Sequence, residues 1–417
     1  MSLRRNTLWN LAGAGAPLLV AVFAIPYLLR VLGMEGFGVL TLVWALIGYF
    51  SLFDLGVGRA LTYELARRSS AAACELAPYM RAGIALTAAT GLIGAAIVAV
   101  LAMPLSNTWL NISADWQYDA LLSFLIAAAG IIPTTIFAGL RGALEGVNRF
   151  AASNINRLVL GVTMFALPSW SVHVHGNHLW IATLYMVIGR LVLMLVVLYQ
   201  LRQFMLLPGK PERAHVAALL NYGVWVAITG IVGPLMVYGD RFFVSAVVGT
   251  LLLPQYAIPQ EALQRLLLIP TALCGALLPQ LAALSRENTL AAYHYNTKRV
   301  ALWMFGVCCF AALLAYPILS IWISPTFAQS AMLVTLVLIV GVWLNSIAMV
   351  SYTVLHAKGK PKITAIFHLI EIVLYAVLIW VLTRQYGLIG AAIAWTARVA
   401  LDFVLLRIAA RRILSGA

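Results

Sequence analysis

Long apolar runs, each bounded by charged or turn-forming residues, follow one another along almost the whole chain. A helix needs about 20 apolar residues to cross the hydrocarbon core of a bilayer, and each run is about that long. We therefore predict an all-α integral membrane protein with about twelve transmembrane helices. The predicted spans cover residues 8–31, 38–62, 80–103, 119–140, 151–170, 179–201, 215–249, 255–284, 299–322, 330–353, 363–383 and 387–409.

A linker rich in proline and glycine, near Leu207 to Glu212, divides the spans into two sets of six. We therefore predict an N-terminal six-helix bundle over residues 1–206 and a C-terminal one over 207–417. Six spans per half give both halves the same orientation, so a duplication would be a parallel repeat. Landmarks separated by 208 to 216 residues favour such a duplication: Asn10 with Asn221, Pro26 with Pro234, and Gly33 with Gly249.

The charges lie mainly in alternate loops. By these span boundaries, 19 Lys and Arg residues lie on one side, against Arg30 and Arg384 on the other. The positive-inside rule places the richer side, with both termini, in the cytoplasm. This explains the net charge of +14 without nucleic acid, for which no binding module appears. With 63% hydrophobic and 10% charged residues, the chain also lacks the charged surface of a soluble protein.

Eleven charged side chains fall inside the predicted spans, three or more residues from either end. A charge in hydrocarbon costs at least about 2.5–3.5 kcal/mol, so we expect each to face a partner or a cavity. The four-residue spacings of Glu261 with Arg265 and of Arg398 with Asp402 leave a structural ion pair and a functional role both open. The full set is Asp54, Arg59, Arg157, Arg190, Asp240, Arg241, Glu261, Arg265, Glu371, Arg398 and Asp402.

Two arginines lie deep without an acidic residue on their own helix. Arg190 is about 18 Å and Arg157 about 10 Å from the nearer end of its span. Glu371 is the acidic counterpart, alone in its span. Either Glu371 neutralises one of these arginines across the bundle, or they line a water-filled cavity. Since arginine grips phosphate through two parallel hydrogen bonds, such a cavity would favour anionic substrates.

No motif for an enzyme or a metal site appears. The chain shows no nucleophile motif, no phosphate-cradling glycine loop and no paired carboxylates at a membrane surface. Its four cysteines lack metal-ligand spacing. His173, His175 and His178 crowd one outer loop, but no Cys or carboxylate stands nearby, which favours a solvated loop over a metal site. We therefore predict a protein that is not an enzyme and holds no metal or other cofactor.

The opening stretch and two loops resemble a known family, the bacterial polysaccharide flippases of the O-antigen type. That family belongs to the superfamily of multidrug and toxin extruders and the lipid II flippase. The topology matches over the whole chain, whereas the motifs are concentrated in the first 60 residues and two loops. The residues are Asn10, Pro26, Arg30, Leu32-Gly33, Phe37-Gly38, Asp54-Leu55-Gly56, the loop from Gly139 to Phe150, and the loop from Val354 to Lys360.

The resemblance implies a flippase of the bacterial inner membrane that moves an undecaprenyl-pyrophosphate-linked oligosaccharide by alternating access. Membrane lipids and a glycan polymerase of the same pathway are the other expected partners. Coupling to H⁺ or Na⁺ is expected to involve Glu371, Asp54 or Glu261, as ion site or charge partner. The expected pyrophosphate-binding residues are Arg190, Arg157, Arg59, Arg265 and Arg398.

Three other functions are weighed against this one. A cation-coupled multidrug antiporter of the same superfamily should have a lumen dominated by carboxylates, whereas the spans hold six arginines against five acids. A membrane polymerase or ligase needs a sizeable outer loop with catalytic side chains, and the outer loops are short. A channel should show a pore-loop signature, and none is present. The antiporter remains the main alternative.

Overall fold

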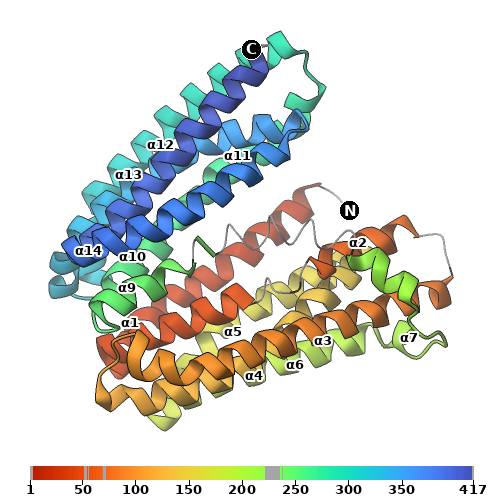
Figure 1. Cartoon of the computed structure of the whole chain (residues 1–417), viewed down its shortest axis with the longest axis horizontal. Coiled ribbons are helices and arrows are strands. Elements are labelled where there is room, and N and C mark those ends of the chain that lie inside the picture. Colours follow the sequence, from red (N-terminus) through yellow and green to blue (C-terminus); the bar gives the residue numbers. More distant parts are fainter. Residues whose placement is uncertain are drawn as a thin grey trace. The chain divides into compact units, whose positions relative to one another are not determined.

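The computed structural model describes residues 3–50, 54, 56–68, 72–220, 235, 236 and 238–415. Within these residues the chain forms helices and turns and no strand, as the sequence predicts (Figure 1). Contacts divide the chain into two compact units, unit 1 (Met1–Gly239) and unit 2 (Asp240–Ala417). The boundary at 206/207 stays a prediction. The landmarks Asn221 and Pro234 lie outside the described residues.

Eight helices in the described part of the chain are long and apolar enough to cross a membrane. This length and composition, together with their number, make the chain a multi-pass membrane protein. The eight segments are Pro17–Tyr49, Ala73–Trp109, Ala114–Gly146, Phe150–His175, Leu179–Gln200, Glu287–Trp322, Pro325–Ala357 and Pro361–Ser415.

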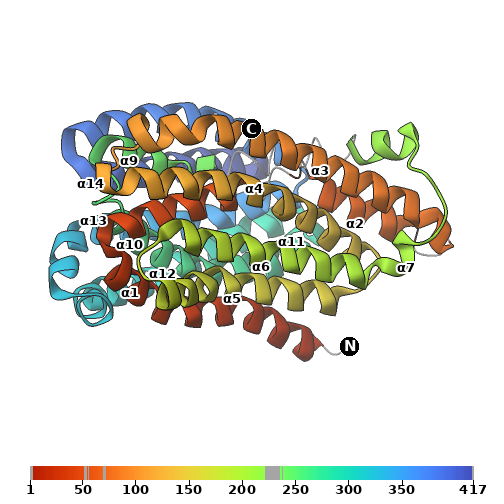
Figure 2. The ribbon, with the colours of Figure 1, turned by 90° about the horizontal axis from the view of Figure 1, so that it is seen from below.

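Unit 1 is organised around α4, which packs on α1, α2, α3 and α6. Its long helices run side by side in Figures 1 and 2. Small residues allow the closest approach, because a Cβ on Gly142 of α4 would lie 2.0 Å from the carbonyl oxygen of Gly58 on α2. The elements are α1 (Leu3–Phe50), α2 (Val57–Arg67), α3 (Ala73–Pro104), η1 (Leu105–Trp109), α4 (Ala114–Gly146), α5 (Phe150–His175), α6 (Leu179–Gln200) and α7 (Arg202–Met205).

Unit 2 is organised in the same way around α13, which packs on α10, α11, α12 and α14. A Cβ on Gly341 of α13 would lie 2.3 Å from the ring of Trp395 on α14, so only glycine admits this indole. The elements are α9 (Asp240–Val248), α10 (Pro254–Gln264), η2 (Arg265–Leu267), α11 (Leu268–Ala283), α12 (Arg286–Trp322), α13 (Pro325–Ala357) and α14 (Pro361–Ser415).

Two helices are too long for one crossing. At 1.5 Å per residue, the 48 residues of α1 and the 55 of α14 would extend about 72 and 82 Å, against about 40–45 Å for a whole bilayer. Each is broken at one glycine, Gly33 in α1 (φ 71°) and Gly387 in α14 (φ 60°), in a conformation that side chains with a Cβ rarely adopt. The sequence predicts a boundary between spans at both places.

The turns themselves recur along the chain. Positions with positive φ return after 211 or 216 residues, which matches the offset between the sequence landmarks. Three pairs follow this rule, and Gly56, Asn111 and Gly209 do not. The pairs are Gly33 (φ 71°) with Gly249 (φ 85°), Asn148 (φ 60°) with Gly359 (φ 70°), and Gly176 (φ 77°) with Gly387 (φ 60°).

Large apolar side chains remain on the outside of each unit. On α12, for example, Leu313 and Ile321 are 78% and 87% exposed, and Phe310 is 64% exposed. Buried polar side chains lie behind this surface, notably in unit 2. The arrangement suits a protein whose surroundings are hydrocarbon and whose interior carries the charges.

Candidate functional site

The interior of unit 2 holds a network of charged and polar side chains, and Asp240 lies at one end of it. This carboxylate begins α9 and is almost completely buried. Its Oδ2 accepts hydrogen bonds from the hydroxyl of Tyr256 (2.8 Å), Nε2 of Gln260 (2.6 Å) and the hydroxyl of Tyr375 (3.4 Å). Donors from α10 and α14 therefore converge on one buried oxygen atom of α9.

The residue beside Asp240 points to a different partner. Nη2 of Arg241 donates to Oε2 of Glu261 at 2.7 Å, and Arg265 donates to the other oxygen of the same carboxylate. Arg241 is buried, whereas Arg265 is exposed and Glu261 is partly exposed. The Glu261–Arg265 pair expected from the four-residue spacing is thus present, and Arg241 makes it a triad across two helices.

A second carboxylate cluster lies within α14. The side chain of Glu371 is fully buried, and its Oε2 lies 3.4 Å from Nδ1 of His368 and 3.8 Å from Nη1 of Arg398. Ligand atoms of His368, Glu371 and Asp402 lie within 4.8 Å of one another, close enough to hold a cation. The break at Gly387 makes this possible, because it lets the two parts of α14 bring His368 and Glu371 to Arg398 and Asp402.

Tyr375 connects the two regions. Its hydroxyl reaches Asp240, and the guanidinium carbon of Arg398 lies 5.5 Å from the centre of its ring. Tyr375 itself is buried. A continuous path of polar contacts therefore runs from Asp240 through Tyr375 and Arg398 to Glu371.

Replacing Asp240 by Ala is expected to destabilise the protein strongly. The change leaves three buried donors, on Tyr256, Gln260 and Tyr375, without their acceptor, at a cost of about 1–3 kcal/mol each. Asp240→Asn keeps one oxygen acceptor and should cost less. The folded fraction that survives heating in detergent, followed by size-exclusion chromatography, measures the effect. Asp115→Ala, at an exposed aspartate in the first turn of α4, should behave as wild type and serves as the control.

Unit 1 contains a charge of another kind. Arg190 is only 8% exposed and shares the buried face of α6 with Met186, Leu193 and Val197. Within the described residues its guanidinium forms no ion pair, and its buried Nε has no hydrogen-bond partner. An arginine inside an apolar core without a counter-ion is a strong candidate for an anion ligand.

The other expected site residues of unit 1 lie in different surroundings. Arg157 on α5 and Arg59 on α2 are both exposed. The carboxylate of Asp54 accepts hydrogen bonds from the backbone N–H groups of Gly56 and Gly58, each at 3.0 Å, at the N-terminus of α2. This contact gives Asp54 a structural role in addition to any other.

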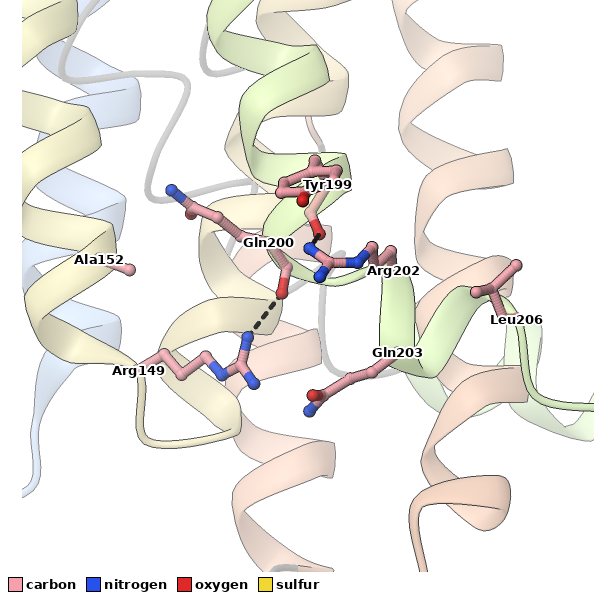
Figure 3. A pocket seen from close by; sticks show the side chains of 7 residues that line it. All are labelled: Arg149, Ala152, Tyr199, Gln200, Arg202, Gln203 and Leu206. Carbon is pink, nitrogen blue, oxygen red and sulfur yellow. Dashed lines mark hydrogen bonds between the residues drawn. The ribbon is translucent and has the colours of Figure 1, made fainter.

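A hollow of about 550 Å³ lies where α5 begins and α6 ends (Figure 3). Its two arginines are already engaged: Arg149 donates to the carbonyl oxygen of Gln200 at 2.5 Å, and Arg202 to that of Tyr199 at 3.2 Å. The guanidinium of Arg202 also lies over the Tyr199 ring. These contacts tie both cations to backbone carbonyls at the end of α6.

Sequence spacing found some of these partners and missed others. It missed Tyr256, Gln260, His368 and Tyr375, because a polar residue in an apolar run carries no sign of a distant partner. His368, three residues before Glu371, and the pair of Tyr256 with Gln260, four residues apart, were within reach of a helical pattern. Of the loop histidines, His173 and His175 are exposed and contact Tyr27 and Tyr185 at 3.4 and 3.1 Å.

Comparisons with known proteins identify the fold. The chain resembles a solved structure of the lipid II flippase MurJ in an inward closed conformation, with a TM-score of 0.77 and 14% identity over 97% of this chain and 87% of that one. It also resembles an inward-facing multidrug resistance MATE family transporter of the MOP superfamily, with a TM-score of 0.76 and 15% identity over 97% and 98% of the two chains. At these identities the likeness shows the fold alone.

Sequence comparison identifies the family. A curated relative, the putative O-antigen transporter of Shigella flexneri, is 31% identical over 422 residues, which cover 98% of this chain and 97% of the relative. The family model described as polysaccharide biosynthesis protein matches residues 3–285. The chain therefore belongs to the polysaccharide biosynthesis protein family and has the fold of the MOP superfamily of membrane transporters.

Proposed function

We propose that the protein flips an oligosaccharide linked to undecaprenyl pyrophosphate, an O-antigen unit or a related surface glycan, across the bacterial inner membrane. Three findings support this proposal. The relative from Shigella flexneri is a putative O-antigen transporter, the family model is one of polysaccharide biosynthesis, and a neighbour in fold is a lipid II flippase. A glycan polymerase of the same pathway is a proposed further partner.

The proposal rests on a contrast between the buried acids of unit 2 and the buried Arg190 of unit 1. Three acids of unit 2 have partners: Glu261 contacts Arg241 and Arg265, Glu371 contacts Arg398 and His368, and Asp240 accepts from three donors. In unit 1, Arg190 is buried and, within the described residues, has no acidic partner. A pyrophosphate provides the oxygens that such a guanidinium grips through two hydrogen bonds, whereas a cationic drug would be repelled. Arg59, Arg157, Arg265 and Arg398 are proposed as further pyrophosphate ligands.

The proposed architecture has twelve spans in two six-helix bundles, over residues 1–206 and 207–417, related as a parallel repeat. The recurrence of positive-φ turns at offsets of 211 and 216 residues supports the duplication. Transport is proposed to occur by alternating access, which two units with their own central helices support. Both termini are proposed to be cytoplasmic, because Lys and Arg gather in alternate loops.

Coupling to H⁺ or Na⁺ is proposed at Glu371, where His368 and Asp402 supply further ligand atoms. Two carboxylates this close repel one another when both are ionised, and a proton or a cation between them relieves the repulsion. Glu261 and Asp54 are the other proposed ion or charge partners. The contacts of Glu261 with two arginines, and of Asp54 with two backbone N–H groups, favour Glu371 over both.

Complementation tests the function. In a bacterial strain whose O-antigen flippase gene is deleted and whose glycan pathway matches this protein, expression of the chain is expected to restore surface glycan. Gel analysis of lipopolysaccharide measures the outcome. Resistance to cationic dyes and drugs, measured in a strain that lacks its own extruders, should not change.

The multidrug antiporter is the alternative, since a fold neighbour is a multidrug resistance transporter. It predicts the opposite pair of results: new resistance to cationic compounds and no surface glycan. A failure of glycan restoration in every matched host, with the protein present in the membrane, would contradict the flippase proposal.

A further inference from the structure

A second hollow, of about 570 Å³, lies within unit 2 between α12, α13 and α14. Eleven residues line it, and none of them is an aspartate or glutamate. Three are permanent cations, Lys298 on α12 and Arg407 and Arg411 on α14. A hollow with three like charges and no acid is an electrostatic trap for an anion.

The cations in this hollow are not engaged by the protein as those in Figure 3 are. Within the described residues, Lys298, Arg407 and Arg411 form no ion pair and donate no hydrogen bond. Arg407 makes a cation–π contact, with its guanidinium carbon 5.6 Å from the centre of the Phe403 ring. In the hollow of unit 1, by contrast, both arginines donate to backbone carbonyls.

The walls of the hollow are rigid, aromatic and polar at defined points. The hydroxyl of Tyr293 is bonded to Ser351 (3.0 Å), and Nε1 of Trp343 donates to the carbonyl oxygen of Ala301 (3.0 Å). The hydroxyl oxygen of Thr297 is buried without a hydrogen-bond partner. Three cations, an unused hydroxyl and fixed aromatic rings match a phosphate group with an apolar body beside it.

The positions of the three cations along α12 and α14 give the depth of the hollow in the membrane. Lys298 lies about 36 Å from the Trp322 end of α12, and Arg407 about 30 Å from the break at Gly387 in α14, at 1.5 Å per residue. The hydrocarbon core is about 30 Å thick, so the cations lie where hydrocarbon meets the headgroups. The proposed topology places this end of unit 2 at the cytoplasmic leaflet, which carries the anionic phospholipids.

We propose that this hollow binds the phosphate headgroup of an anionic phospholipid from the cytoplasmic leaflet, as a site separate from the one that carries the transported glycan. Basic pockets between transmembrane helices on the cytoplasmic side are known to take acidic headgroups. Both a phospholipid and the polyprenyl diphosphate of the cargo carry the required phosphate. The phospholipid is the bulk species at this depth, so mass action favours it.

The test compares two triple variants of the full chain in lipid nanodiscs. The first triple variant removes the three cations of the hollow and consists of Lys298→Gln, Arg407→Gln and Arg411→Gln. Arg299→Gln with Arg384→Gln and Arg412→Gln removes the same charge from unit 2 at positions that do not line the hollow. The probe is phosphatidylglycerol, added in steps to phosphatidylcholine nanodiscs and counted on the protein by native mass spectrometry.

We expect wild type and the second triple variant to retain one phosphatidylglycerol molecule, and the first triple variant to bind it about tenfold more weakly or worse. An equal loss in both variants would mean general surface attraction and would overturn the proposal. So would an absence of retained phosphatidylglycerol in wild type. Retention of undecaprenyl diphosphate alone, dependent on the same three cations, would assign the hollow to the cargo and would also overturn it.

Folding of the variants is checked in pure phosphatidylcholine, where their thermal unfolding should match that of wild type. Arg411→Gln replaces the triple variant if the latter fails to fold, because Arg411 is exposed and forms no ion pair within the described residues. Its matched control is Arg412→Gln, at the next residue of the same helix, which is also exposed. Weaker binding in Arg411→Gln alone supports the proposal, and equal binding in the two contradicts it.

Discussion

Replacing Arg190 by Met is expected to raise the thermal stability of the protein while it sharply reduces glycan transport. The guanidinium is buried among Met186, Leu193 and Val197 and, within the described residues, lacks an ion pair. Relief of such a charge is worth about 2.5 kcal/mol or more, and methionine fills the space with an adaptable apolar side chain. Transport should fall about ten- to a hundredfold, the loss expected for a charge-assisted hydrogen bond of about 1.5–3 kcal/mol.

A substitution that raises stability but lowers transport indicates that the residue binds a ligand, whereas a structural residue loses both together. Arg190→Lys keeps the charge but loses the two-pronged geometry, so a partial loss of transport is expected. Arg384→Gln, at an exposed arginine near a turn, should leave both quantities unchanged and serves as the matched control. Unfolding midpoints in detergent and surface glycan in the complemented strain are the two measurements. A destabilised Arg190→Met protein, or one with full surface glycan, would contradict the assignment.

Substitutions at Glu371 and Arg398 are expected to have the second large effect, on both the stability and the transport of the protein. Glu371→Gln alone leaves the buried cation of Arg398 without this carboxylate, and the loss of one partner of a buried pair costs about 3–5 kcal/mol. Removing both charges, with Arg398→Gln in the same chain, should restore most of that stability. Transport driven by an imposed proton or sodium gradient in membrane vesicles should be lost in the single and the double variant alike.

The double variant distinguishes the two roles of the pair. If Glu371 only neutralises Arg398, restored stability brings restored transport. If Glu371 takes part in coupling, or Arg398 in binding pyrophosphate, the stable double variant remains inactive. Asp402→Asn, at the third member of the cluster, should weaken transport with a smaller effect on stability, since Oδ1 of Asp402 has no hydrogen-bond partner in the described part of the chain. Full gradient-driven transport in the double variant would refute the coupling proposal.

The sequence predicted what depends on neighbouring residues. Apolar length predicted membrane-spanning helices, eight of which the described residues contain, and the positive φ values of Gly33 and Gly387 fall where spans were expected to meet. The four-residue spacing gave the pair of Glu261 with Arg265. All of these follow from helical periodicity and span length, which act within a few dozen residues.

Contacts between distant segments escaped the same reasoning. Arg241 reaches Glu261 across 20 residues, and Tyr375 reaches Asp240 across 135. The partner of a buried charge on another helix depends on how the helices pack, which a single sequence does not specify. Arg398 illustrates this, since spacing suggested Asp402 as its partner, and the structure places it 3.8 Å from Glu371, on the other side of the break in α14.

The proposed duplication, which the recurring turns support, would have an evolutionary consequence. The subunits of a symmetric dimer share one sequence, so their common interface must be self-complementary. Two halves that are encoded separately in one chain are free of this requirement. The frame, held by the turns at Gly33 and Gly249 or at Gly176 and Gly387, then stays constant while the interiors diverge. Within the described residues, unit 1 contains a buried arginine without an ion pair, and unit 2 contains a linked set of acids and bases. A dimer of identical halves would instead carry the same charges in both.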